Sequence, residues 1–333
     1  MQISGWDEEA PELSFHKPPI SELTQALTKE QASASTVVPS TVVYGLSELT
    51  SDELKAVLPI WSRLSAVAKH RVLSALNEAS EAMFELGFRE IALLSLGDKS
   101  SLVRAKAIDL LWTDESAETM RKLMRMAESD PEATIRSRAL ESLGRFILLG
   151  EYGDIPADLA AQAQTLTYTI HKNMSEPVEI RRRALEALSN SSHAAVEQLI
   201  LAAYADGNHE LRIGALFAMG RTCNEIWRDR LLAELENDEY EYVYEAIRAC
   251  GQIQIADSVQ RIGEFALSED QEIQLMAIWS LGEIGGRQAF EILARLEQEL
   301  ADEEVAAVLD EALDAAGFSL NSASLRLELD DEF

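Results

Sequence analysis

The side chains that could act in catalysis or hold a metal ion are few and far apart in this sequence. The chain of 333 residues has five histidines: His16, His70, His171, His193 and His209. None lies in an HExxH sequence, and none has a cysteine at the spacing of a zinc site. Cys223 and Cys250 are isolated, so they form neither a disulfide framework nor a metal-binding pair. The sequence therefore predicts no catalytic residue and no metal site.

The sequence also lacks the motifs that bind phosphate or carry a catalytic nucleophile. The glycines follow no phosphate-binding loop pattern, and no GxSxG sequence occurs. We therefore expect no cofactor, and the residues favour a protein without enzymatic activity.

The charge balance narrows the possible partners. The chain has 58 acidic and 29 basic side chains, a formal net charge of -29. The negative electrostatic field of such a charge repels nucleic acid and anionic lipid. No segment reaches the roughly 18 to 20 apolar residues of a membrane span, and the first residues do not resemble a signal peptide. With so few cysteines, these features predict no nucleic-acid partner, no membrane insertion and a cytoplasmic location.

An internal repeat supplies the elements that must position the remaining side chains. Segments such as TIRSRALESLG and EIQLMAIWSLG align on a small residue, alanine, here termed the anchor. The anchors are Ala107, Ala139, Ala184, Ala215, Ala246, Ala277 and Ala312, spaced by 32, 45, 31, 31, 31 and 35 residues, with a weaker copy near Val72. Apolar residues at i, i+4, i+5 and i+8 predict an amphipathic helix, and a second apolar stripe follows after a turn. Each repeat is thus predicted to be a pair of antiparallel helices.

A helix pair this short buries its apolar stripes only by stacking on copies of itself. The repeat therefore predicts an all-α fold, an α-solenoid (right-handed superhelix) of about seven to eight helix pairs. Glycines near the end of several first helices are expected to be left-handed C-terminal caps: Gly144, Gly220, Gly251 and Gly282.

Four repeats share an acidic residue followed by an apolar-Arg pair and then the anchor Ala: Asp98 with Val103-Arg104, Asp130 with Ile135-Arg136, Glu176 with Ile180-Arg181, and Asp206 with Leu211-Arg212. Over roughly residues 60–317 this pattern resembles the HEAT-repeat superfamily, in particular the short HEAT-like repeats of phycobilisome lyases. The resemblance implies a ladder between repeats made by the acid and the arginine. Val243 and Gln274 replace the arginine later in the chain, so the ladder should end after the fourth of these repeats. Hydroxylases built from helical repeats bind two irons through several His-Glu pairs, whereas this chain has one, His209-Glu210.

The two ends of the chain and the 45-residue spacing between two anchors indicate where the repeat region begins, ends and is interrupted. Residues 1–45 are expected to be a largely disordered arm with a short helix at 20–27, residues 46–317 the solenoid, and residues 318–333 an acidic tail, either disordered or able to add as a strand to a partner. Thr50 and Glu53 have the spacing of a capping box. The 45-residue spacing places an insertion at 145–158, which either forms a binding rim or extends the core.

Two surface columns are candidate partner sites. On the second helices, equivalent positions hold Lys122, Gln198, Arg230, Arg261 and Glu291, with Arg121 and Arg125 beside them. This second-helix column predicts a local basic track for an acidic or extended peptide, unless its members are ordinary solvated side chains. On the first helices, an apolar strip comprises Ile213, Phe217, Tyr244, Leu275 and Trp279. Packing between neighbouring helices is the favoured explanation of the strip, and exposure to a partner or a second copy is the other.

These observations favour a non-catalytic protein-protein interaction scaffold or adaptor, with a protein partner and a monomeric state. The alternative is an enzyme or enzyme subunit related to phycobilin lyases, which the resemblance leaves open. A self-assembling array is disfavoured by the polar face of the last helix. The acidic charge is concentrated in residues 224–333, which hold 27 acidic and 7 basic side chains.

Overall fold

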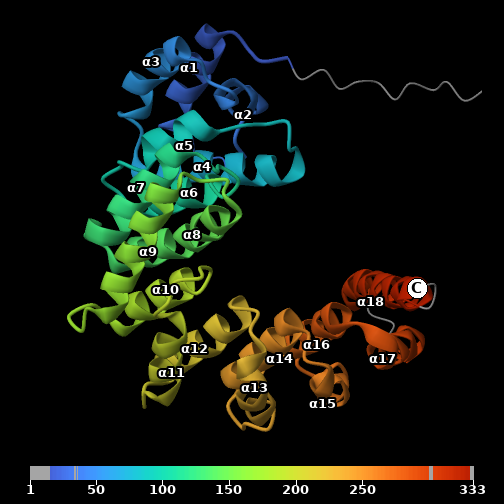
Figure 1. Cartoon of the computed structure of the whole chain (residues 1–333). Helices are drawn as coiled ribbons and strands as arrows, with labels where there is room; N and C mark the ends of the chain where they lie inside the picture. Colours follow the sequence, from blue (N-terminus) through green and yellow to red (C-terminus); the bar gives the residue numbers. More distant parts are fainter. Residues whose placement is uncertain (1–15, 34, 36, 300–302, 331–333) are drawn as a thin grey trace, which may run out of the picture. The chain divides into compact units, whose positions relative to one another are not determined.

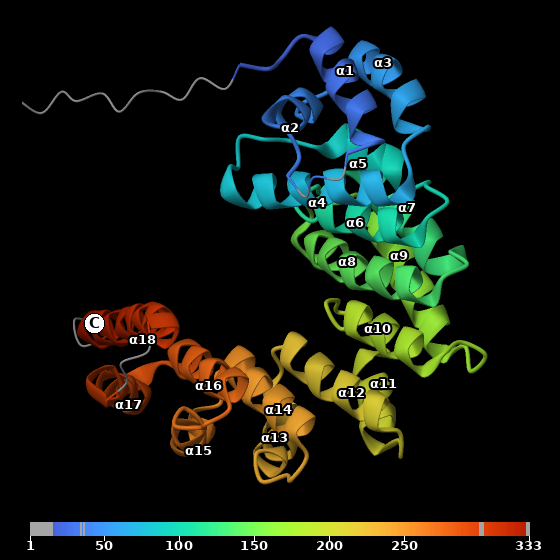
Figure 2. The ribbon, with the colours of Figure 1, turned by 180° about the vertical axis from the view of Figure 1, so that it is seen from behind.

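The computed structural model describes residues 16–33, 35, 37–299 and 303–330 (Figures 1 and 2). All regular elements in these residues are helices. They alternate as first and second helices of successive pairs, which confirms the predicted all-α solenoid of stacked helix pairs. The chain divides into two compact units: unit 1 comprises Met1–Met126 and Asp130–Arg138, and unit 2 comprises Ala127–Ser129 and Ala139–Phe333.

The first helix of each pair carries a buried anchor residue. These helices are α4 (Ala66–Ala82), α6 (Ser101–Leu110), α8 (Ala133–Tyr152), α10 (Val178–Leu188), α12 (His209–Arg221), α14 (Tyr240–Ile253), α16 (Gln271–Ile284) and α18 (Glu303–Asp330). The second helices are α5 (Arg89–Ser95), α7 (Ala117–Ser129), α9 (Ala157–Lys172), α11 (Val196–Ala205), α13 (Arg228–Glu234), α15 (Val259–Phe265) and α17 (Gly286–Glu299). Two short 3-10 helices, η1 (Glu225–Trp227) and η2 (Ala256–Ser258), precede α13 and α15.

Unit 2 shows how the pairs stack. Its first helices α10, α12, α14, α16 and α18 pack one against the next (Figure 1). Each second helix also packs against the first helix of the following pair. One hydrophobic core runs through these contacts without interruption from Leu185 to Ala316. This continuity is what stacking of short helix pairs requires, because a single pair cannot bury its own stripe.

The glycine that several repeats share near the end of the first helix differs in role from the prediction. Gly220, Gly251 and Gly282 lie inside their helices and have no left-handed backbone, so their prediction as C-terminal caps is wrong, as it is for Gly144. A Cβ atom on Gly251 would lie 3.0 Å from Cα of Ser280 on the next first helix. The equivalent distances are 2.9 Å for Gly220 and 2.8 Å for Gly282. Glycine is needed here because neighbouring first helices approach too closely for a side chain.

The N-terminal segment also differs from the expectation. Helices α1 (Ile20–Glu30) and α2 (Ser40–Leu46) lie within the arm expected to be largely disordered. They are ordered because Leu23, Leu27 and Val42 are buried, and Arg71 of α4 donates to the Glu30 carboxylate at 2.7 Å. Residues 1–15 lie outside the described part of the chain. Helix α3 (Ser51–Trp61) begins with the predicted capping box, in which both reciprocal hydrogen bonds form.

The insertion at 145–158 mostly extends helix α8, which continues to Tyr152. Phe146 and Ile147 are fully buried, so the extra residues enlarge the core, as one of the two interpretations expected. A Cβ on Gly150 would lie 2.5 Å from Cβ of Ala160, which shows how closely α8 packs on α9. The last helix also runs further than expected. Helix α18 continues to Asp330, well into the segment expected to be disordered or a strand.

Candidate functional site

An ion-pair ladder occupies the position three residues before each anchor. From α4 to α16 this position holds Lys69, Arg104, Arg136, Arg181, Arg212, Val243 and Gln274. Three of these cations bind an acid at the end of the second helix that follows. Of the arginines that the resemblance named, Arg104 and Arg212 therefore form rungs, Arg104 with an acid that the resemblance named and Arg212 with another acid.

Arg104 and Asp130 form the most enclosed rung. Nε and Nη2 of Arg104 donate to the two carboxylate oxygens of Asp130 at 2.8 and 2.7 Å, and the side chains are only 8% and 6% exposed. Nη1 of Arg104 donates to the carbonyl oxygen of Asp98 at 2.9 Å. One guanidinium group thus ties together the chain segments that follow α5 and α7. A buried pair of this kind is favourable only while all its partners are present.

Lys69 adds a rung that the sequence reasoning missed. Its Nζ lies 2.5 Å from the carboxylate of Asp98. Burial opposes ionisation of Asp98, but hydrogen bonds from Lys69 and from the backbone N–H of Ser100 outweigh it and hold the pKa of that carboxyl below its ordinary value. Because Lys69 precedes Val72 by three residues, the repeat register alone would have identified this rung.

The Arg212 rung uses an acid that the repeat pattern does not indicate. Glu234, almost fully buried, accepts hydrogen bonds from Arg212, from the Tyr204 hydroxyl and, at 2.8 Å, from Nδ2 of Asn237. The Arg212 guanidinium lies 4.9 and 4.8 Å from the ring centres of Tyr204 and Tyr242. Burial, and then Glu234, raise the pKa of Tyr204. Glu234 was missed because it precedes the expected acidic position, where Asn237 stands.

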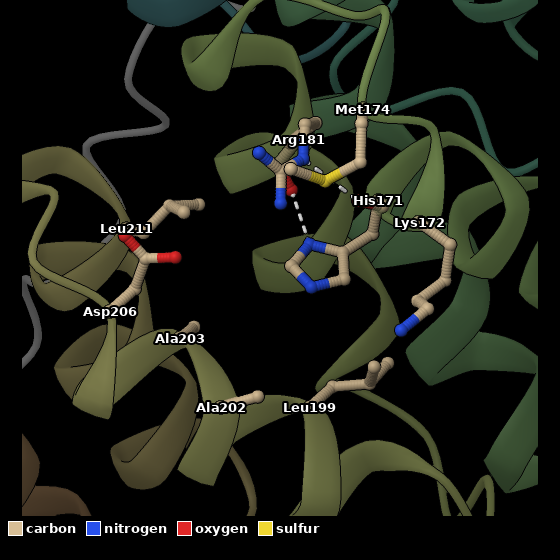
Figure 3. A pocket seen from close by; sticks show the side chains of 9 residues that line it. All are labelled: His171, Lys172, Met174, Arg181, Leu199, Ala202, Ala203, Asp206 and Leu211. Atoms are coloured by element: carbon tan, nitrogen blue, oxygen red, sulfur yellow. Dashed lines mark hydrogen bonds between the residues drawn. The ribbon is translucent and has the colours of Figure 1, made fainter.

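The ladder ends after Arg212, as predicted. Val243 is buried and apolar, and Nε2 of Gln274 donates to the carbonyl oxygen of Ala266 at 3.2 Å. The Arg181 rung is open instead. A cavity of about 90 Å³ lies between Arg181 and Asp206, the acid at the equivalent position (Figure 3). Arg181 has no ion pair among the residues that the structure describes.

The residues of the second-helix column lie on α7, α11, α13, α15 and α17, and their exposure differs from one helix to the next. Gln198, Arg230 and Glu291 are exposed, and Lys122 and Arg261 are partly exposed. Arg261 pairs with Glu236 at 3.0 Å and with Glu264 at 2.5 Å, while Lys122 lies 3.8 Å from Glu118 and Arg287 binds Glu291 at 2.9 Å. Arg121 and Arg125 are exposed on α7.

Arg230 is the member of the column whose charge is most available. It is exposed on α13, and its guanidinium lies 5.8 Å from the ring centre of Trp227. It forms no ion pair within the described ranges. The column is therefore only partly neutralised by its neighbours.

The apolar strip is partly incorporated into the core of unit 2. Ile213 is buried, and Phe217, Tyr244, Leu275 and Trp279 are half-buried. Tyr244 and Leu275 pack against the hydrophobic core, and the Arg248 guanidinium lies 4.0 Å from the ring centre of Phe217. These contacts fit the packing explanation of the strip.

The histidines do not converge on a common site. Among the described residues, one group of three possible metal ligands occurs, formed by His209, Glu239 and Glu241. His209 and Glu241 are 43% and 53% exposed and lie 3.9 Å apart. Their contact repeats one pair further along, where the Tyr240 hydroxyl donates to Glu272 at 2.7 Å. The group is therefore explained as one of a series of contacts between successive first helices.

Comparison with known proteins finds one family model and several similar solved structures. Residues 228–314 match the family model of HEAT repeats. No curated protein matches the chain. Among solved structures, similar folds include YibA of Escherichia coli (18% identity, 85% of this chain and 98% of that one, TM-score 0.43) and the CpcE–CpcF complex of phycocyanin lyase from a Nostoc species (15% identity, 81% and 95%, TM-score 0.48). Importin beta is also similar (10% identity, 89% and 53%, TM-score 0.42).

No helix in the described part of the chain combines the length and apolar composition needed to cross a bilayer.

Proposed function

We propose that this chain is a non-catalytic scaffold or adaptor that binds a protein partner through the exposed side chains of its second helices, in the cytoplasm. The observation that supports this most is the difference between two groups of arginines. Arg104 and Arg212 of the first helices pair with acids at the end of the second helix that follows, whereas Arg230 of a second helix is exposed and forms no ion pair within the described residues. The second helices present side chains at a regular spacing along the stack, which suits an extended partner.

Within this proposal, Arg230 and Arg261 are the principal partner contacts. They are 31 residues apart on successive second helices, and Arg230 has a free charge among the described residues. Both lie in a half of the chain that is otherwise strongly acidic, so they provide local attraction for an acidic segment of a protein. The overall charge of -29 disfavours nucleic acid as that partner.

The test is affinity capture with the intact protein, with captured proteins identified by mass and their affinity then measured as a function of salt. We expect Arg230→Glu with Arg261→Glu to reduce the affinity and its salt dependence. Lys55→Glu with Lys99→Glu, which makes the same charge change at two exposed positions of unit 1, is the control. Equal affinity and equal salt dependence in both variants would show that the second-helix column is not the binding surface.

The same preparation tests the lyase alternative. A scaffold should purify without pigment, whereas visible absorbance that copurifies with the chain would favour an enzyme of the chromophore-lyase kind. Truncations that probe the N-terminal arm should stop at residue 15, because removal of α1 and α2 would expose the buried Leu23 and Leu27.

We also propose that the protein is monomeric. The solution mass of the wild type should equal one chain and should be unchanged in a Phe217→Ser, Trp279→Ser variant. A wild-type dimer that this variant dissociates would instead make the apolar strip a self-association surface.

A further inference from the structure

The open rung at Arg181 has the components of a binding site. In the rungs of Lys69, Arg104 and Arg212, the cation meets an acid directly. Arg181 is on α10 and its equivalent acid, Asp206, follows α11, but a cavity of about 90 Å³ separates them. Figure 3 shows both side chains among those that line this space.

Two reciprocal hydrogen bonds fix the cation in place. Nε of Arg181 donates to the carbonyl oxygen of His171 at 3.1 Å, and Nδ1 of His171 lies 2.8 Å from the carbonyl oxygen of Arg181. Since a carbonyl only accepts, Nδ1 must carry the proton. The terminal nitrogens of the guanidinium then remain available to a ligand, because no protein partner binds them in the described part of the chain. A group held in this way loses little freedom on binding.

The neighbouring arginines are already neutralised. Arg182 binds Glu186 and Glu210 at 2.7 and 2.6 Å, and Arg183 binds Glu186 at 2.8 Å. Arg181 is thus the one member of this run of three arginines that has no ion pair among the described residues.

The charged groups that face the cavity favour an anion. Arg181 from α10 and Lys172 from the end of α9 are cationic, and Asp206 is the one acid in the lining. Burial, and to a smaller extent Arg181 and Lys172, lower the pKa of His171, so its ring is neutral at pH 7. The local charge is therefore positive although the whole chain is strongly negative.

We propose that this cavity binds a carboxylate group, with Arg181 as its main contact and Lys172 as a second one. A planar carboxylate matches the two parallel N–H bonds that a guanidinium group offers. The volume corresponds to about three water molecules, which suits a carboxylate with a short hydrocarbon stem. Leu199, Ala203 and Leu211 line the cavity and can contact that stem. The source is either an acidic side chain of a partner, in which case the proposal rests on the scaffold function, or a free small acid.

The probe for the first source is N-acetyl-glutamate N-methylamide, which presents a glutamate side chain as a protein does. Its neutral analogue, N-acetyl-glutamine N-methylamide, is the matched control, and succinate represents the free acids. The readout is the NMR signal of the His171 ring, which lies in the cavity wall. We expect a saturable shift with a carboxylate probe at concentrations up to about 50 mM and none with the glutamine analogue. Tighter binding of the glutamate probe than of succinate identifies a protein side chain as the source, and the reverse identifies a free acid.

Three variants test the assignment of the contacts. Arg181→Gln should weaken binding by about tenfold or more, and Lys172→Gln by about threefold. Arg183→Gln, in the same run but paired outside the cavity, should leave binding unchanged. Lys172 is exposed, so its variant remains informative if Arg181→Gln fails to fold. No saturable shift in the wild type, an equal shift with the glutamine analogue, or unchanged binding in Lys172→Gln and Arg181→Gln would overturn the proposal. Because the probes are small molecules, these results do not depend on whether a protein partner is found.

Discussion

At the scale of single residues, the Arg104–Asp130 pair is the contact whose disruption should cost most. Asp130→Ala leaves the buried Arg104 guanidinium without its carboxylate, while the remaining bond to the Asp98 carbonyl keeps it in place. We expect the free energy of unfolding to fall by about 3–5 kcal/mol, measured by urea denaturation. Asp52→Ala removes a pair that is 75% and 92% exposed and should cost less than about 1 kcal/mol. Similar losses in the two variants would contradict a buried rung that stabilises the fold.

His171 should make stability depend on pH. Burial lowers its pKa in the folded state, so below about pH 6.5 the unfolded chain takes up a proton that the folded chain does not. The free energy of unfolding should therefore decrease from pH 7.5 to 5.5. His171→Asn keeps a donor for the Arg181 carbonyl but cannot titrate, so its stability should decrease less over this range. Denaturation at both pH values measures the difference, and parallel losses in variant and wild type would refute the assignment.

At the scale of the elements, close contact between first helices should reverse the usual effect of a helical substitution. Replacing glycine by alanine within a helix ordinarily stabilises it by about 1 kcal/mol. In Gly251→Ala the added Cβ would lie 3.0 Å from Cα of Ser280, so we expect overpacking to win and stability to fall by about 1–3 kcal/mol.

The control is Gly207→Ala in the loop between α11 and α12, where the added Cβ meets no atom within 4 Å, so no overpacking is expected. Thermal unfolding of the two variants provides the comparison. If Gly251→Ala proves more stable than the wild type, the spacing between α14 and α16 is wider than described here.

The same contacts explain what the sequence could and could not predict. The anchors could be identified because small residues such as Ala215 and Ala246 recur every 31 residues or so. The first helices could be identified because apolar residues around each anchor follow the helical period. Spacing could not identify the role of Gly251, since an end cap and a close helix contact both require the absence of a side chain. Helix α1 was expected only as a short helix at 20–27, and α2 was missed because its seven residues are too few to show a period. The Arg104 rung was implied by the resemblance to HEAT-like repeats, whereas the open Arg181 rung depends on distances between side-chain ends, which a sequence pattern does not contain.

At the scale of the whole molecule, stacked repeats should confine damage to their neighbourhood. Leu27 of α1 is fully buried, and Leu27→Ala should destabilise the surrounding helices by about 2–5 kcal/mol. Because each pair contacts mainly the pairs beside it, hydrogen exchange should accelerate in α1–α4 and remain unchanged in α14–α16. Exchange measured peptide by peptide with mass spectrometry tests this, and acceleration throughout α14–α16 would mean that the chain unfolds as one cooperative body.

The end of the ladder at Arg212 has a consequence for how such a chain can change in length. In the rungs of Lys69, Arg104 and Arg212, removing the second helix that follows together with its acid would leave a cation without its partner. From α14 to α16 the position is held by Val243 and Gln274, and the helices meet through small residues. A unit of 31 residues can be inserted there without leaving a ladder cation unpaired. We therefore expect insertion of a repeat, by gene duplication or by design, to destabilise the protein least in this part of the chain.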